Sequence, residues 1–310
     1  MKFKKYMHLE RFGHREVKGI NLGTCHIFPK LDGTNSSLWL DDNEEATLEN
    51  AVASRLRAGS RTRTLTLVAD NAGFYCWAIT QPNLIRYLED HPKHRLYGEW
   101  LVPHTLKTYR ADAWKRFWIF DVSVEGKQFE KCVPYEEYAP ELEKYGLDYI
   151  TPICKVENPS EEWLYGFLDR ANFLVEDGKG HGEGIVIKNY NFSSPDGSQT
   201  WAKIVRQEFK EQNVKAFGIN NITLTDPVEA RIVDKFLTES MIDKIYAKIV
   251  VENGGWDSKC IPRLLETCFY DLIMEEMWSI LKEFKVPTVN FRSMKMYTTQ
   301  KIKLVKKDLF

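Results

Sequence analysis

The chain has 310 residues, of which 43% are hydrophobic and 28% are charged, and its formal net charge is -1 at pH 7. This length accommodates two domains of ordinary size, and the composition is typical of a globular protein. The near-neutral net charge gives no sign of a nucleic-acid partner. It does not exclude one, because a polyanion responds to the local potential of one face of a protein and not to the total charge. No apolar run reaches the roughly 18 residues needed to span a membrane.

The six cysteines are dispersed along the chain, and no two of them form a C-x-x-C pair. Several lie in apolar, strand-like runs, which favours buried, reduced thiols over disulfides or a zinc site. The N-terminus is basic but lacks the apolar core of a signal peptide. We therefore expect a cytoplasmic protein.

Residues 20 to 209 consist mainly of β-rich runs separated by turn residues. The predicted strands are 24–28, 35–40, 62–69, 73–78, 95–101, 116–124, 184–189 and 200–205. Helical patterns intervene at 81–89, 135–145 and 160–172. Long antiparallel strands with helices between them indicate an α+β fold.

The pattern changes after residue 209. Asp226 and Pro227 predict a helix start, because Asp can cap a helix and Pro suits its first position. Helical patterns follow at 228–251, as one helix or two, and at 261–284, and the last stretch is basic. We expect a β-rich domain over residues 1–220 and a small, mostly helical C-terminal domain over residues 221–310.

Lys30 follows a short apolar run and begins the sequence K-L-D-G-T-N, which ends at Asn35. A lysine at the end of a strand, beside a tight turn, can direct its amine at a phosphate and attack it when neutral. The tetrapeptide alone is weak evidence, because a solvated turn lysine has the same sequence. The residues further along the chain decide between these interpretations.

Four later segments place acids and lysines at strands. Glu99 follows a glycine, Glu183 precedes an apolar strand, and Lys203 lies inside another apolar strand. A lysine in an apolar strand is costly to bury without an anionic partner. The segments are Y-G-E-W at 97–100, F-W-I-F-D at 117–121, E-G-I-V-I-K at 183–188 and W-A-K-I-V at 201–205. Together they indicate a cleft that binds phosphates.

The order of these segments resembles the motifs of the covalent nucleotidyltransferases, which are DNA ligases, RNA ligases and mRNA capping enzymes. The extension to K-x-D-G-T-N and the segment Ser60-Arg61-Thr62-Arg63 are similar to the RNA ligase 2-like family of phages and their relatives. The resemblance covers roughly residues 5 to 210. It implies an antiparallel-sheet nucleotidyltransferase (adenylyltransferase) domain and an ATP-dependent RNA ligase that joins 3′-OH and 5′-phosphate ends.

The resemblance also implies a role for each matching residue. The catalytic set is Lys30, which becomes lysyl-AMP, Glu183, which assists metal-dependent transfer, and Lys203, which stabilises phosphate charge. Three implied nucleotide contacts are Asn35 at the phosphates, Glu99 at the ribose or a metal-bound water, and Arg61 at the ribose and the nucleic-acid end. At the adenine, Phe120 is implied to stack on the ring and backbone groups near Phe28 to contact its edge. Lys188 is a further implied nucleotide contact. Arg55, Arg57 and Arg63 compete with Arg61 for its role.

The chemistry accounts for the expected cofactors. A free lysine has a pKa of about 10.4, so a neighbouring cation such as Lys203 or Mg²⁺ is expected to make Lys30 reactive. Mg²⁺ prefers oxygen ligands, which implies Glu99 and Glu183 as ligands directly or through water, and Mn²⁺ could replace it. The expected partners are ATP and RNA, as a nicked duplex or RNA/DNA hybrid, with a monomeric, phage-type enzyme acting in a host cytoplasm.

Two positions depart from the family pattern. The second lysine of the last motif is replaced by Val205, and the sequence leaves open whether the adjacent Arg206 substitutes, because neighbouring strand residues face opposite sides. Pro29 stands where relatives often carry a polar residue. Two other functions stay open: a DNA ligase or capping guanylyltransferase, which would carry a β-rich C-terminal domain, and a non-catalytic nucleic-acid-binding protein.

Overall fold

A computed structural model of the chain describes residues 1–41, 55–102, 109–125, 131–206 and 227–310. These residues divide into two compact units, one reaching Val205 and the other beginning at Arg206. The predicted boundary between residues 220 and 221 lies outside the described residues. The described residues of the first unit form two β-sheets and four α-helices, and those of the second are helical, which makes the protein α+β as predicted.

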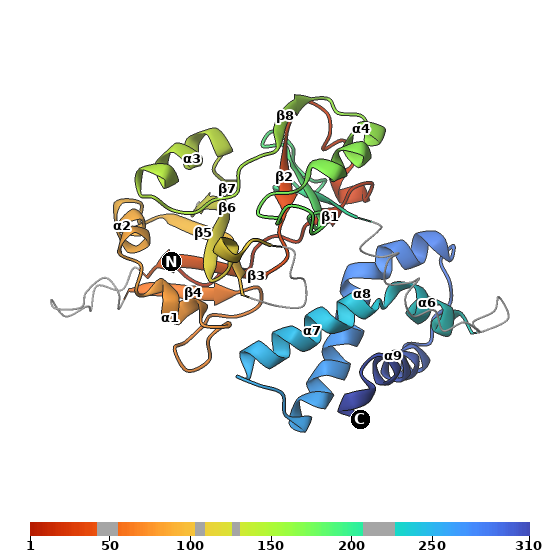
Figure 1. The fold of residues 1–310 in the computed structure, drawn as a ribbon. Helices are drawn as coiled ribbons and strands as arrows, with labels where there is room; N and C mark the ends of the chain where they lie inside the picture. Colours follow the sequence, from red (N-terminus) through yellow and green to blue (C-terminus); the bar gives the residue numbers. More distant parts are fainter. Residues whose placement is uncertain (42–54, 103–108, 126–130, 207–226) are drawn as a thin grey trace. The chain divides into compact units, whose positions relative to one another are not determined.

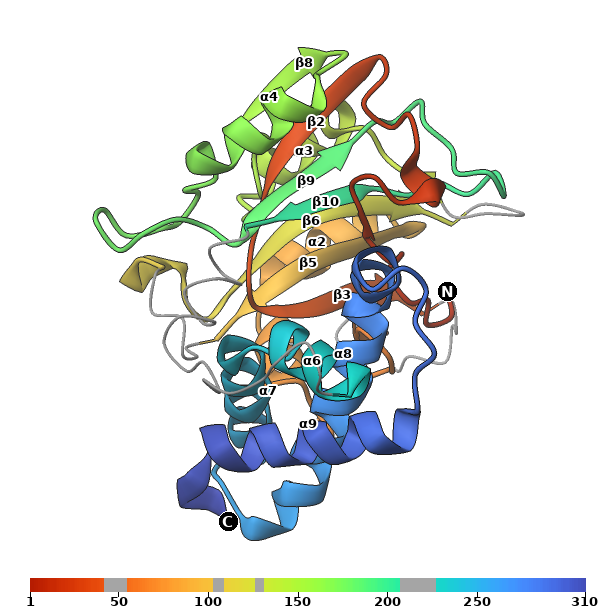
Figure 2. The same cartoon turned by 90° about the vertical axis from the view of Figure 1, so that its right-hand side faces the viewer.

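The first sheet has five strands in the order β1-β10-β9-β2-β8 (Figure 2). All neighbouring strands are antiparallel except β1 and β10, which are parallel. The strands are β1 (Glu10–Arg11), β2 (Thr24–Lys30), β8 (Cys154–Glu157), β9 (Gly184–Lys188) and β10 (Ala202–Val205). This sheet therefore joins the beginning of the unit to its end.

The second sheet also has five strands, in the order β4-β3-β5-β6-β7, and is antiparallel throughout. Its strands are β3 (Thr34–Leu40), β4 (Leu56–Ser60), β5 (His94–Leu101), β6 (Arg116–Val124) and β7 (Lys131–Cys132). Only a three-residue turn separates β2 of the first sheet from β3 of the second. The end of β2 is thus held where the two sheets meet.

Three apolar clusters stabilise this unit. One lies between the two sheets and includes Phe28, Tyr97 and Val186. A second packs α1 (Phe74–Ala78), α2 (Pro82–Asp90) and α3 (Tyr135–Lys144) against the second sheet, and the third packs α4 (Glu161–Gly166) against the first (Figure 1). Strands covered on both faces are expected to be apolar on both faces, which explains the unbroken apolar run of β9.

Two strand predictions were wrong. Residues 62–69 form a loop after β4, because the Arg63 side chain donates hydrogen bonds to the main-chain oxygens of Ala69, at 2.6 Å, and Asp70. Residues 74–78 form α1, because the Asp70 carboxylate accepts hydrogen bonds from the amides of Tyr75 and Cys76 at the start of that helix. Hydrogen bonds from side chains to backbone oxygens and amides outweigh the alternating pattern in this segment.

The second unit contains α6 (Val228–Phe236), α7 (Glu239–Glu252), α8 (Ile261–Glu283) and α9 (Phe291–Val305). Its core is formed by aliphatic and aromatic side chains of all four helices, including Ile232, Ile245, Leu272 and Ile302. The predicted segment 228–251 is two helices, and the basic C-terminal stretch forms a further helix. In the part of the chain that the structure describes, no helix has the length and apolarity to cross a membrane.

Candidate functional site

Lys30 is the last residue of β2, and its side chain contacts Glu183, the residue before β9. Its Nζ donates a hydrogen bond to Glu183 Oε2 at 2.7 Å, and the two side chains are 20% and 14% exposed. Lys30 lies opposite Gly184 in the antiparallel ladder, which brings two residues 153 positions apart into contact. The amine of Lys30 is therefore accessible to a solute and already oriented by an acid.

Gly184 allows this close approach between β9 and its neighbour. A Cβ atom at Gly184 would lie 2.1 Å from the main-chain oxygen of Ile204 in β10. Any other residue would force the two strands apart and shift Glu183. The glycine after the acid in E-G-I-V-I-K is thus required by packing.

The turn after Lys30 is held against β5. The amide of Gly33 donates a hydrogen bond to Glu99 Oε1 at 2.9 Å. A Cβ atom at Gly33 would lie 2.8 Å from the main-chain oxygen of Trp100, so the turn fits only because this residue is glycine. Asn35 lies opposite Glu99 in the β3–β5 ladder, so both half-buried side chains share one face of the sheet.

Lys203 shares a face of the first sheet with Lys30. Lys203 lies opposite Val186, which lies opposite Phe28, and side chains two residues apart in a strand share a face. Val205 lies opposite Gly184 and so occupies this face next to β9. Arg206 follows the last residue of β10 and belongs to the second unit. The position of the family's second lysine is therefore apolar on the face that carries Lys30.

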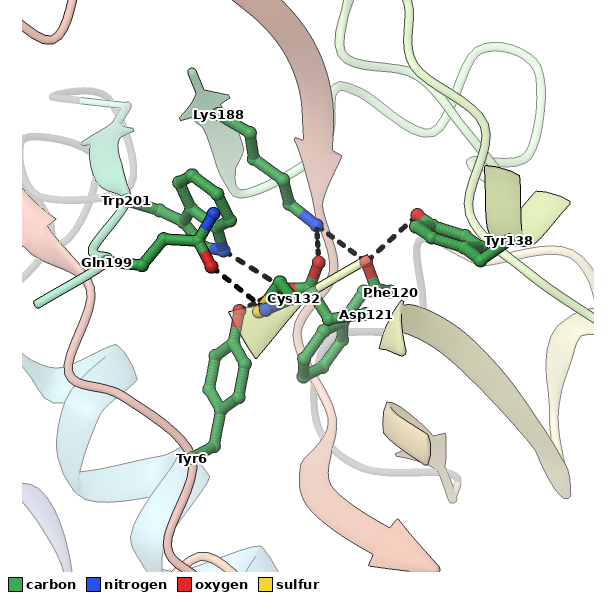
Figure 3. Close-up of polar contacts among 8 residues, drawn as sticks. All are labelled: Tyr6, Phe120, Asp121, Cys132, Tyr138, Lys188, Gln199 and Trp201. Carbon is green, nitrogen blue, oxygen red and sulfur yellow. Dashed lines mark hydrogen bonds and ion pairs between the residues drawn. The ribbon is translucent and has the colours of Figure 1, made fainter. Parts of the chain in front are cut away.

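Lys188 lies in a buried ion pair between the two sheets (Figure 3). Its Nζ donates hydrogen bonds to Asp121 Oδ1 at 2.8 Å and to the main-chain oxygen of Phe120 at 2.5 Å. It also lies 4.3 Å from the ring centroid of Phe28, whose side chain is buried. Because Lys188 is 2% exposed, a structural role competes with the predicted nucleotide contact.

Asp121, which had no predicted role, accepts hydrogen bonds from three kinds of donor at once: an ammonium, a hydroxyl and an indole N–H. Its Oδ2 receives hydrogen bonds from the Tyr6 hydroxyl and from Trp201 Nε1, the latter at 3.1 Å (Figure 3). A β-bulge at Phe120 turns Asp121 toward the first sheet, since Tyr97 lies opposite Asp121 and Gly98 opposite Ile119. No sequence signal beyond the acid in F-W-I-F-D marks this cluster.

The remaining predicted residues lie on the second sheet or on its loops. Phe120 is half-buried, with its ring centroid 4.9 Å from that of Tyr6. Arg61 is exposed at the start of the loop after β4, whereas Arg63 is committed to holding that loop in place. The placement of Arg61 is compatible with contact to a ligand, and Arg63 has a structural role.

The acids of this site match the chemistry of a Mg²⁺ ion. In the described ranges, no group of three or more His, Cys, Asp or Glu is arranged to hold a metal by itself. Mg²⁺ commonly binds one or two carboxylates and completes its shell with waters and substrate phosphates. Glu183, bonded to Lys30, and Glu99, bonded to the Gly33 amide, are both partly buried carboxylates, and this donor set fits such an ion.

The site thus combines a strand-end lysine in contact with an acid and a glycine turn that joins the two sheets. Residues 24–205 match the family model described as RNA ligase, which covers more than half of the chain. The chain therefore belongs to the RNA ligase family. No curated protein matches it.

Solved structures of an RNA ligase from Naegleria gruberi are similar to this chain. One, a variant with ATP and Mn, has a TM-score of 0.51 at 16% identity, and covers 68% of this chain and 58% of that one. A second, the ligase with PPi, has a TM-score of 0.49 at 17% identity over 69% of this chain and 58% of that one. This chain thus spans less than two thirds of the length of those ligases.

Proposed function

We propose that this protein is an ATP-dependent RNA ligase that works through a lysyl-AMP intermediate on Lys30. The observation that supports it most is the contact of Lys30 with Glu183, together with the bond from Gly33 to Glu99. Three motif segments far apart in sequence meet at Lys30 and the turn that follows it, and the Lys30 side chain is 20% exposed. A turn lysine without a catalytic role would need no such convergence.

The first chemical step follows from this geometry. The Nζ of Lys30 attacks the α-phosphorus of ATP, a P–N bond forms, and the P–O bond to pyrophosphate breaks. An amine attacks through its lone pair, so a proton must leave Nζ, and the Glu183 carboxylate already accepts a hydrogen bond from it at 2.7 Å. Lys203, on the same face, would stabilise charge on the transferring phosphoryl group.

Two transfers complete the proposed reaction. The AMP passes from Lys30 to the 5′-phosphate of an RNA end, and a 3′-OH then attacks that activated end and releases AMP. Asn35 and Glu99 share one face of the second sheet, where they would contact the nucleotide, with Phe120 stacked on adenine and Arg61 at the RNA end. Backbone groups near Phe28 would contact the adenine edge, since its side chain is buried.

We propose Mg²⁺ or Mn²⁺ as the metal, held by Glu183 and Glu99 directly or through water. Bound there, it would neutralise triphosphate charge and orient the pyrophosphate leaving group. A Naegleria gruberi RNA ligase variant with the same fold has been solved with ATP and Mn, which supports ATP and a divalent metal as cofactors. Chelation is expected to stop lysyl-AMP formation without changing the thermal unfolding temperature by more than a few degrees, because one weakly bound ion adds little stability.

The helical second unit supports an RNA ligase over the other covalent nucleotidyltransferases. DNA ligases and capping enzymes are expected to carry a β-rich domain after the last motif, whereas the described residues from 227 to 310 form helices and no strand. We accordingly propose a nucleotidyltransferase domain over residues 1–220 and a helical domain over 221–310. Nicks in duplex RNA are the proposed substrate, for a monomer acting in the cytoplasm of a phage-infected cell.

The central test is labelling with α-³²P-ATP and α-³²P-GTP in the presence of Mg²⁺. The protein is expected to retain label from ATP alone, and Lys30→Ala is expected to abolish it because the variant lacks the proposed nucleophile. Lys155→Ala is a matched control, since Lys155 pairs with Glu136 on the protein surface. Label that survived Lys30→Ala, or that came from GTP, would refute the proposal.

A panel of nicked duplexes then identifies the substrate. Each nick carries RNA or DNA on its 3′-OH side and RNA or DNA on its 5′-phosphate side, and single-stranded RNA ends are compared at the same concentration. Sealing of the nick with RNA at the 3′-OH is expected to be fastest. A preference for single-stranded ends or for an all-DNA nick would contradict the proposed substrate while leaving lysyl-AMP formation in place.

A further inference from the structure

Tyr109 places its hydroxyl on the turn that follows Lys30. The amide of Asp32 donates a hydrogen bond to the Tyr109 hydroxyl oxygen at 2.7 Å, and the next amide, of Gly33, donates to Glu99. Two successive amides of the turn are therefore satisfied by side chains from elsewhere in the chain. A buried amide deprived of its acceptor is costly, so the conformation of this turn depends on both side chains.

The position of Tyr109 is itself fixed. Its backbone forms a β-bridge with Val175, and the amide of Arg110 donates to the main-chain oxygen of Leu174 at 2.9 Å. Its ring meets that of Trp114 edge-on at 5.5 Å, and the residue is 4% exposed. The hydroxyl therefore cannot leave the turn unless this bridge is displaced.

The surroundings keep this hydroxyl neutral. Burial raises the pKa of Tyr109 well above its usual value, and the charge of Asp32 raises it further, with smaller effects from Glu183 and Glu99. A phenol that stays protonated can hold the turn without adding a negative charge where a triphosphate would bind. These three acids belong to the segments around Lys30, which places Tyr109 beside the site.

We propose that Tyr109 is a positioning residue for the nucleophile. By accepting the Asp32 amide it holds the turn Leu31–Gly33 in the conformation that directs Lys30 toward Glu183. Its catalytic consequence rests on the proposed function, whereas the contact with the turn does not. Tyr109 touches neither the reacting amine nor a substrate phosphate in this role.

Tyr109→Phe tests the role because it removes only the hydroxyl. Tyr87→Phe is the matched control, since Tyr87 is fully buried and its hydroxyl bonds to His94 Nδ1 at 2.9 Å, away from the Lys30 turn. Three quantities are measured on the full chain: the NMR amide exchange rate of Asp32, the rate of lysyl-AMP formation, and the KM for ATP. Thermal unfolding of both variants shows how much stability each has lost.

In Tyr109→Phe the Asp32 amide is expected to exchange about tenfold faster or more, because its acceptor is gone. Lysyl-AMP formation is expected to slow by about tenfold to a hundredfold, with the KM for ATP within about twofold of wild type. Tyr87→Phe should lose comparable stability and change none of these quantities.

Each other outcome has a distinct meaning. Unchanged Asp32 exchange in Tyr109→Phe, or an unchanged rate of lysyl-AMP formation, overturns the positioning role. An equal loss of rate in Tyr87→Phe shows a general stability effect and also overturns it. A wild-type protein that forms no lysyl-AMP refutes the proposed function instead, and the Asp32 exchange rate then decides by itself whether Tyr109 holds the turn.

Discussion

Replacing Lys188 by methionine is expected to destabilise the first domain strongly. Methionine preserves the apolar stem but removes the ammonium that bonds Asp121 at 2.8 Å and the Phe120 main-chain oxygen. The Asp121 carboxylate is fully buried, so it would lose its counter-charge in a water-free environment, at a cost of about 3–5 kcal/mol. In a domain of about 200 residues each kcal/mol shifts the Tm by about 2–4 °C, which gives a fall of about 6–20 °C.

Thermal unfolding of Lys188→Met, Asp121→Asn and the double variant measures this effect by calorimetry. The double variant is expected to recover most of the lost stability, because neither charge then remains buried alone. Lys155→Met is the control, since its exposed pair with Glu136 contributes about 1 kcal/mol or less. A Lys188→Met protein with the wild-type Tm would refute the expected destabilisation. If that variant also failed to form lysyl-AMP, the result would support the nucleotide contact that the family resemblance implies for Lys188.

Three further predictions follow from particular contacts. Gly184→Ala places a Cβ 2.1 Å from a main-chain oxygen of β10 and should lower the free energy of unfolding, measured in urea, by about 1–3 kcal/mol. A Cβ at Gly166 would have no neighbouring atom within 4 Å, so Gly166→Ala should leave the stability unchanged, and equal effects of the two substitutions would contradict the packing argument. Burial lowers the pKa of His94 to about 4, so between about pH 6.5 and pH 4 the unfolded chain binds a proton that the folded chain does not, and stability should fall as the pH drops through this range. If the stability of His94→Asn fell equally steeply with pH, other groups would be the cause. Thr238→Ala removes the hydroxyl that accepts a hydrogen bond from the Met241 amide at the start of α7 and should destabilise the helical unit by about 1 kcal/mol, whereas Thr238→Ser should be as stable as wild type. Unchanged unfolding of Thr238→Ala would show that this cap does not contribute to stability.

Local patterns predicted most of the elements because their faces are buried. The apolar runs at β2, β6 and β9 were identified as strands, and α7 and α8 as helices, from residues whose spacing reflects one or two covered faces. The two wrong strand predictions fall at residues 62–78, where polar side chains decide the conformation, and short strands such as β4 and β8 were not predicted. Arg63 and Asp70 bond backbone groups several residues away there, and such contacts have no period in the sequence.

The glycine in each motif shows how far sequence reasoning reaches. The sequence identified Gly33 and Gly184 as parts of motifs, but it gave no reason why a methyl group is excluded at either position. That reason lies in the neighbouring strand, since a Cβ at Gly33 would meet β5 and one at Gly184 would meet β10. Strand order depends on pairing between distant segments, which local sequence does not encode.

By itself, the sequence determined the chemical groups of this protein: a lysine at a strand end, acids in or beside strands, and the order in which they occur. Tertiary structure decided which of them meet. It paired Lys30 with Glu183, and it placed Lys188 on Asp121 between the sheets and Tyr109 on the Asp32 amide. The physical reason is that a side chain's partner depends on strand register and on a single bulge, and both are set by packing of the whole domain.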